Sequence, residues 1–175
     1  MNRIRIALAA SAMTLLGSAP MMAQTCTTNP CTVAVTTSAT VTDVLRLTLD
    51  QLTLDLGTPS ETDYDAGFRD AASHRTATVK ANRPWHVAVV GNAANFTYAG
   101  SLTNPNKTAA DLVWAKTAGG LATPDGDMGA TANLVSGSTG TSSTSQDIYF
   151  RTKWFWASDV PGSYGLVVNF TLSAP

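Results

Sequence analysis

Acid–base and nucleophilic groups are scarce in this chain of 175 residues. There are two histidines, His74 and His86, and no G-x-S-x-G pattern marks any of the many serines as an activated nucleophile. His74 follows Asp70 in a polar stretch and could pair with it, whereas His86 is expected at a solvent-facing or edge position of a strand. The scarcity disfavours an enzyme, and we expect no catalytic residue and no cofactor.

Charge is also scarce, since Asp, Glu, Lys and Arg make up only 13% of the residues. No cluster of basic side chains is typical of a nucleic-acid-binding surface, so no nucleic-acid partner is expected. Two acid pairs, Asp63 with Asp65 and Asp125 with Asp127, have a spacing that could offer oxygens to calcium. Neither completes an EF-hand pattern, so solvated turn residues and no metal site are the favoured interpretation.

Long apolar runs are absent except near the N-terminus. Arg3 and Arg5 precede an apolar run over residues 6–16, and Gly17-Ser18-Ala19-Pro20 and then a small residue at Ala23 follow, which is the order of a secretory signal peptide. The run is shorter than the roughly 20 residues of a spanning helix. We therefore predict a cleaved signal peptide over residues 1–23, one domain over residues 24–175, and no membrane span in the mature chain.

Removal of the signal peptide leaves nine Lys and Arg against 12 Asp and Glu, a net charge of −3. The expected location is outside the cytoplasm: secreted, on the cell surface or periplasmic.

Cysteine occurs only twice, at Cys26 and Cys31, on either side of Asn29-Pro30. An oxidising compartment permits a disulfide, and the Asn-Pro turn could bring the two sulfurs together. A redox pair or a metal site is the alternative, but the spacing matches neither C-x-x-C nor a complete zinc set. We predict a local disulfide that restrains the new N-terminus.

Short stretches of alternating apolar and polar residues fill most of the chain, and no segment has a convincing helical period. Residues 61–73 are interpreted as a polar loop, residues 117–131 as an exposed loop, and the Gly/Ser/Thr-rich residues 137–145 as a long hairpin loop. The fold expected is an antiparallel β-sandwich of immunoglobulin-like character. The predicted strands are 32–37, 41–49, 52–56, 75–81, 85–90, 95–99, 111–116, 133–136, 146–157 and 163–172.

The last two predicted strands flank a turn at residues 158–162, which predicts a terminal β-hairpin. Alternation places one set of apolar residues of the final strand on a single inward face. That set is Tyr164, Leu166, Val168, Phe170 and Leu172.

The preceding strand carries two of the four tryptophans, Trp154 and Trp156, on the same face as Ile148 and Phe150. We interpret this face as core, although exposed tryptophans would form a platform for sugar rings. The opposite face combines cationic and aromatic side chains and is the predicted contact surface. Its residues are Tyr149, Arg151, Lys153 and Phe155.

Two segments, Trp85-His86-Val87 and Phe170-Thr171-Leu172, resemble the paired motifs of the bacterial WxL surface-domain family. Val87 stands where the family has Leu, and Phe170 where it has Trp. The resemblance implies an exported domain that associates non-covalently with the cell envelope, in a family whose members are thought to bind peptidoglycan. It carries over Trp85, Val87, Phe170 and Leu172 as motif residues. Taken by themselves, these residues are expected in the core.

The layout is also similar to secreted fimbrial or spore-coat-type subunits, which are β-sandwiches ending in a strand. In that interpretation Gln24 to Ala39 would donate a strand to a neighbouring subunit. The complete terminal strand argues against an open groove that could receive it.

The function expected from these observations is an exported, non-catalytic β-sandwich that mediates cell-surface or envelope association, or adhesion. Its partners would be cell-envelope polysaccharide or other surface proteins. Two alternatives remain: a structural subunit that self-associates by N-terminal strand exchange, and a carbohydrate-binding module that uses the tryptophans.

Overall fold

The structure is a computed structural model, and it describes residues 27–175. The predicted signal peptide, residues 1–23, lies outside the described residues. Residues up to Thr40 and residues from Val41 onward form two separate units. In the first unit, residues 27–40 contain no helix or strand and are all exposed, so the strand predicted over 32–37 is not formed. No helix within residues 27–175 has the length and apolar character needed to cross a membrane.

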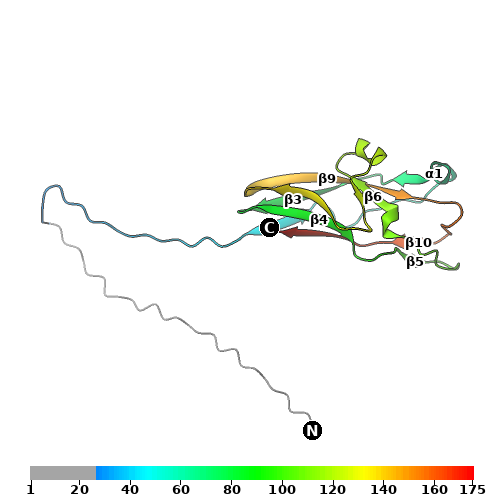
Figure 1. The fold of residues 1–175 in the computed structure, drawn as a ribbon, viewed down its shortest axis with the longest axis horizontal. Coiled ribbons are helices and arrows are strands. Elements are labelled where there is room, and N and C mark those ends of the chain that lie inside the picture. The colour runs from blue at the N-terminus through cyan, green and yellow to red at the C-terminus, as the bar shows by residue number, and fades with distance from the viewer. Residues whose placement is uncertain (1–26) are drawn as a thin grey trace, which may run out of the picture. The chain divides into compact units, whose positions relative to one another are not determined.

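Residues 41–175 fold into antiparallel sheets packed face to face, which confirms the all-β, sandwich-like expectation (Figure 1). The larger sheet has the order β1-β3-β9-β6-β7, with β2 also paired to β9, and the smaller has the order β11-β4-β8; β10 and β5 form a separate pair. The strands are β1 (Leu45–Leu49), β2 (Phe68–Asp70), β3 (Arg75–Ala81), β4 (Trp85–Gly91), β5 (Thr97–Ala99), β6 (Leu112–Ala115), β7 (Gly126–Asp127), β8 (Ala132–Gly137), β9 (Thr141–Lys153), β10 (Ser163–Gly165) and β11 (Val168–Ser173).

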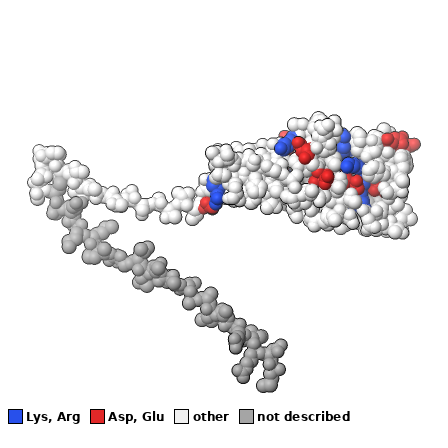
Figure 2. Space-filling view, in the orientation of Figure 1, with Lys and Arg blue, Asp and Glu red and all other residues white. Residues whose placement is uncertain are grey.

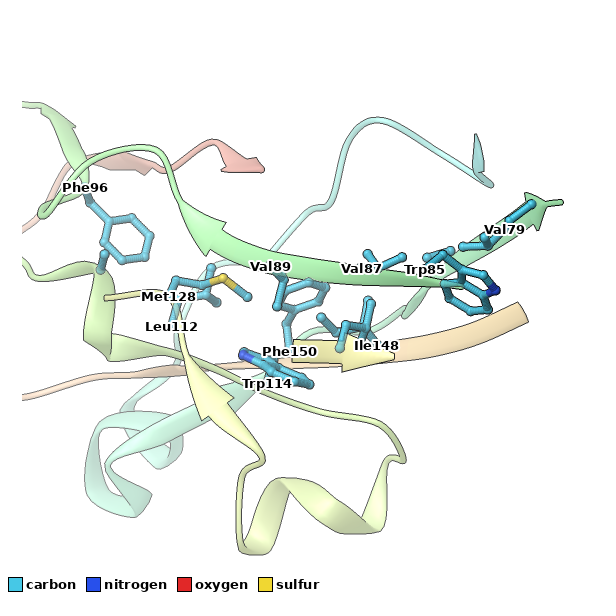
Figure 3. Packing of buried hydrophobic residues seen from close by; sticks show 14 residues of the cluster. Val79, Trp85, Val87, Val89, Phe96, Leu112, Trp114, Met128, Ile148 and Phe150 are labelled. Atoms are coloured by element: carbon cyan, nitrogen blue, oxygen red, sulfur yellow. The ribbon is translucent and has the colours of Figure 1, made fainter. Parts of the chain in front are cut away.

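The core lies between these two sheets, as period two in the strands predicts. On β4, Trp85, Val87 and Val89 are at most 2% exposed, and they face Ile148 and Phe150 on β9 (Figure 3). The inward set predicted for the final strand is confirmed in direction, because all five of its residues pack against this core. All five are nevertheless only half-buried.

The predicted terminal hairpin is wrong, because β9 and β11 belong to different sheets. The second half of β9 already has a neighbour on each side: β6 pairs with residues 149–152 and β2 with residues 151–153. No edge of β9 is left there for the strand that follows. The chain therefore crosses at residues 154–162 to the other sheet, where β11 pairs with β4.

Residues 61–73 are not a loop, since they contain α1 (Glu61–Ala66) and β2. Ser60 and Asp63 form a capping box at the start of α1, and Gly67, at φ 78°, ends it in the left-handed conformation. The helix is too short to show a 3.6-residue period, so the caps are its only local signal.

Two other segments that were predicted as loops also contain regular secondary structure. Residues 117–131 contain the 3₁₀-helix η2 (Gly119–Ala122) and β7, and they bury Leu121 and Met128 in the core. Residues 141–145 of the Gly/Ser/Thr-rich run belong to β9, where they pair with β3. Threonine favours strands when a partner is available, which local composition cannot reveal. A second 3₁₀-helix, η1 (Ala109–Asp111), precedes β6.

The stability of the sandwich should depend on residues at its centre. Leu134 on β8 is fully buried, whereas Leu102 is 52% exposed. Leu134→Ala should lower the free energy of unfolding by about 2–5 kcal/mol, because it removes packed methyl groups and leaves a cavity. Leu102→Ala should change it by less than about 0.5 kcal/mol. Urea denaturation of both variants measures the difference, and equal effects would contradict this core assignment.

Candidate functional site

An apolar groove opens between the two sheets along their β1 and β11 sides. Its volume is about 370 Å³. Buried Leu112 and Phe150 belong to its lining, while Leu52 and Val167 are 90% and 60% exposed. The remaining apolar residues of the lining are Leu49, Leu54, Leu56, Leu166, Val168 and Phe170. The core side of the final strand is therefore incompletely covered, contrary to the expectation that a complete terminal strand would close any groove.

Both strands beside the groove are sheet edges, because β1 pairs only with β3 and β11 only with β4. The N–H of Asn92 donates to the carbonyl of Val167, 2.8 Å away, which fixes the phase of the β11–β4 ladder. In an antiparallel ladder hydrogen-bonded and non-hydrogen-bonded pairs alternate. Residues 168, 170 and 172 therefore direct their N–H and C=O groups away from β4, toward the free edge.

The same alternation applies to β1. The Asp50 N–H donates to Thr76 at 3.1 Å, and the Asn82 N–H donates to Val44 at 3.2 Å. Together with the register, these bonds leave the peptide groups of residues 45, 47 and 49 directed away from β3. On both edges the free peptide groups belong to the residues whose side chains face inward or toward the groove.

Residues 51–56 form one wall of the groove without pairing, so the strand predicted over 52–56 is not formed. Asp50 ends β1, since its carboxylate accepts the Thr76 N–H at 2.9 Å, and this hydrogen bond lowers the pKa of Asp50. Arg75, only 8% exposed, donates its Nε to the Thr53 carbonyl at 2.8 Å and a second guanidinium nitrogen to the same oxygen. A buried, bifurcated contact thus positions the segment that presents Leu52, Leu54 and Leu56.

The four WxL-type motif residues are brought together by the fold. Leu172 lies opposite Val87 in the β11–β4 ladder, and Phe170 is two residues before it. Trp85 and Val87 are buried, whereas Phe170 and Leu172 are half-buried, and Phe170 lines the groove. These positions agree with the expectation that the motif residues belong to the core.

The predicted contact strip on β9 is largely engaged in contacts within the domain. Arg151 pairs with Asp70, with Nη2 3.0 Å from Oδ2, and its guanidinium lies 3.7 Å above the ring of Phe68. Tyr149 stacks on His74 at 4.8 Å between ring centroids. Lys153 is half-buried, and Phe155 lies beyond the end of β9 at 45% exposure.

Trp154 and Trp156 do not share one environment. Trp154 is 5% exposed, as predicted for core, but Trp156 is 62% exposed, so its assignment to the core is wrong. Because β9 ends at Lys153, the period-two alternation that placed Trp156 inside no longer applies.

The polar candidates have structural partners. Asp70 pairs with Arg151 and not with His74, whose Nε2 lies 3.9 Å from a carboxylate oxygen of Asp147 instead. His86 is half-buried, and its Nε2 lies 3.0 Å from the Ser173 hydroxyl oxygen.

The paired acids also have partners. Asp63 caps α1 and pairs with Arg69, Asp125 accepts the Lys116 N–H at 2.8 Å, and Asp127 accepts the Gly129 N–H at 2.8 Å. No group of three or more metal-ligating side chains occurs among the described residues. Cys26 lies outside the described residues, so the Cys26–Cys31 disulfide stays a prediction.

Comparison with known proteins gives little that could identify the chain. No family model matches it, so the WxL resemblance gains no support, and no curated protein matches it. Among solved structures, it is similar to a chain from a chaperone–usher pilus, with 14% identity and a TM-score of 0.46. The match covers 85% of this chain and 99% of that one. A likeness at this level does not decide function.

The groove wall should depend on the planar fork of Arg75. In Arg75→Lys the ammonium cannot replace the two guanidinium N–H groups that converge on the Thr53 carbonyl oxygen, so the variant should lose about 1–3 kcal/mol of stability. Amide hydrogen exchange in residues 51–56 should also accelerate. The matched control is Arg46→Lys, an exposed site on β1, which should change neither quantity. If the two variants behave alike, Arg75 does not hold the wall.

Proposed function

We propose that this chain is a non-catalytic structural subunit of an exported assembly, in which the N-terminal segment of one copy fills the apolar groove of another. The observation that carries the proposal is the coincidence of an uncovered apolar groove with two free strand edges. An added strand would satisfy the peptide groups of an edge and cover the apolar lining in one step.

The N-terminal segment has the pattern that such a strand needs. Val33, Val35, Thr37 and Ala39 alternate with smaller or polar residues, so a strand made from residues 33–39 would have one face suited to an apolar groove. It would be as long as residues 166–172, about 23 Å at 3.3 Å per residue. Val33 and Val35 are 49% and 82% exposed, so their side chains are available.

A second copy is a better donor than the same chain. Residues 42–44 extend the line of β1, because Asn82 bonds to the carbonyl of Thr42 at 2.7 Å and accepts the Val44 N–H at 2.9 Å. Arg83 and Asp43 form an ion pair at the same place. Folding the N-terminal segment back along β1 of its own domain would require a tight turn directly before these bonded residues.

Export and surface association fit the same proposal. The proposed subunit would work outside the cytoplasm, which agrees with the expected signal peptide and with the few charged side chains on the face shown in Figure 2. Envelope association or adhesion would then be a property of the assembly.

The test compares two aspartate substitutions in the mature chain, residues 24–175. Val35→Asp would place a carboxylate in the apolar groove, so self-association should weaken by at least about a hundredfold. Ala34→Asp adds the same charge on the other face of the donated strand and should assemble like the wild type. Size-exclusion chromatography with light scattering, over a range of concentrations, measures the mass of each species.

Two results would count against strand donation: a wild-type chain that stays monomeric at every concentration, or equal loss of assembly in both variants. Deleting residues 24–39 provides a second check, because a deletion that leaves the oligomers intact means that another surface joins the subunits.

A further inference from the structure

Two aromatic side chains stand exposed where the chain leaves β9. Phe155 is 45% and Trp156 62% exposed, directly after the buried Trp154. Neither residue lines the apolar groove, so strand donation does not account for them.

The indole of Trp156 is held in one orientation. Its Nε1 donates to Asp65 Oδ1 at 3.0 Å, and its ring lies 4.7 Å from the Tyr64 ring at an interplanar angle of 30°. Tyr64 in turn packs on Trp154, with 6.0 Å between ring centroids. An exposed aromatic surface is thus anchored to α1 and, through Tyr64, to the core.

The loop that displays these rings is fixed by a buried ion pair. Lys107 Nζ lies 2.8 Å from Asp159 Oδ2, and the two side chains are 0% and 3% exposed. The same carboxylate oxygen accepts the Phe155 N–H at 2.8 Å, while the ammonium also donates to the Lys153 carbonyl at 2.6 Å. Burying two charges is costly unless their geometry is well satisfied, as it is here. The loop therefore has a defined shape before any partner binds.

We propose that Trp156, together with Asp65, forms a binding platform for a carbohydrate chain of β-linked pyranose units. The exposed indole face suits the apolar C–H face of a pyranose ring. The second oxygen of Asp65, which takes no part in the bond to Trp156, can accept a sugar hydroxyl. In an extended β-linked chain the ring faces lie on the outside, where a single exposed indole can stack on them.

A protein partner fits this surface less well. The large exposed apolar side chains here are Phe155 and Trp156, and the polar residues Asp65, which bonds to Trp156, and Ser158 are exposed. A stable protein interface buries about 800 Å² on each side, with an apolar centre. The acidic rim instead supplies acceptors for a ligand rich in hydroxyl donors.

The experiment titrates the mature chain with cellohexaose and chitohexaose, which are soluble β-linked oligosaccharides, and with α-linked maltohexaose. Isothermal titration calorimetry should detect binding of at least one β-linked probe, with maltohexaose weaker. The indole N–H resonance of Trp156 should shift during the same titration, followed by NMR. Failure of both β-linked probes to bind, or equal binding of maltohexaose, would overturn the proposal.

Trp156→Ala should weaken binding of the β-linked probe by about tenfold or more. Val41→Ala, which removes an 84% exposed side chain outside both the groove and this surface, should bind the probe like the wild type. Unchanged affinity in Trp156→Ala, or an equal loss in Val41→Ala, would overturn the platform. Because Trp156 is exposed, its variant should retain the wild-type thermal midpoint, which confirms that it is folded.

Discussion

The structure depends on the pairing of β9, whose second half is hydrogen-bonded to a neighbouring strand on each side. In its second half β6 and β2 occupy both sides, so the last strand of the chain cannot join this sheet. It crosses to the other sheet instead and pairs with β4, where it becomes an edge. Val168 and Phe170 of β11 and Leu49 of β1 then border a groove that the chain from Val41 to Pro175 does not fill.

Unpaired peptide groups and apolar side chains lie beside this groove. Alternation in the two ladders turns the peptide groups of residues 168, 170 and 172, and of residues 45, 47 and 49, toward the free edges. Apolar side chains line the space between them, held partly by the contact of Arg75 with Thr53. An extended, alternating segment is the simplest complement, and residues 33–39 are such a segment. The aromatic surface at Trp156 is built by other contacts, so the proposed strand-binding groove and the proposed ligand platform are separate sites.

The alternation of apolar and polar residues was enough to predict the sandwich, because strands such as β3 and β4 bury alternate residues over most of their length. It was enough, too, for the inward face of the final strand. Pairing could not be predicted locally: β9 and β11 are adjacent in sequence, and only the occupation of β9 by β2 and β6 separates them. The helix α1 was missed because its signal lies in the cap residues Ser60, Asp63 and Gly67. The groove was not predicted, because the residues of a strand do not show whether both of its edges are paired.

The claim that the sandwich lacks one strand is tested most directly by residue-resolved amide hydrogen exchange along β11, in the assembled wild type and in the Val35→Asp monomer. The account predicts alternation in the monomer, with the amides of Val168, Phe170 and Leu172 exchanging fast and those of Asn169 and Thr171 protected. In the assembled wild type all five should be protected. Uniform protection in the monomer, or fast exchange of the alternate amides in the assembly, would contradict it.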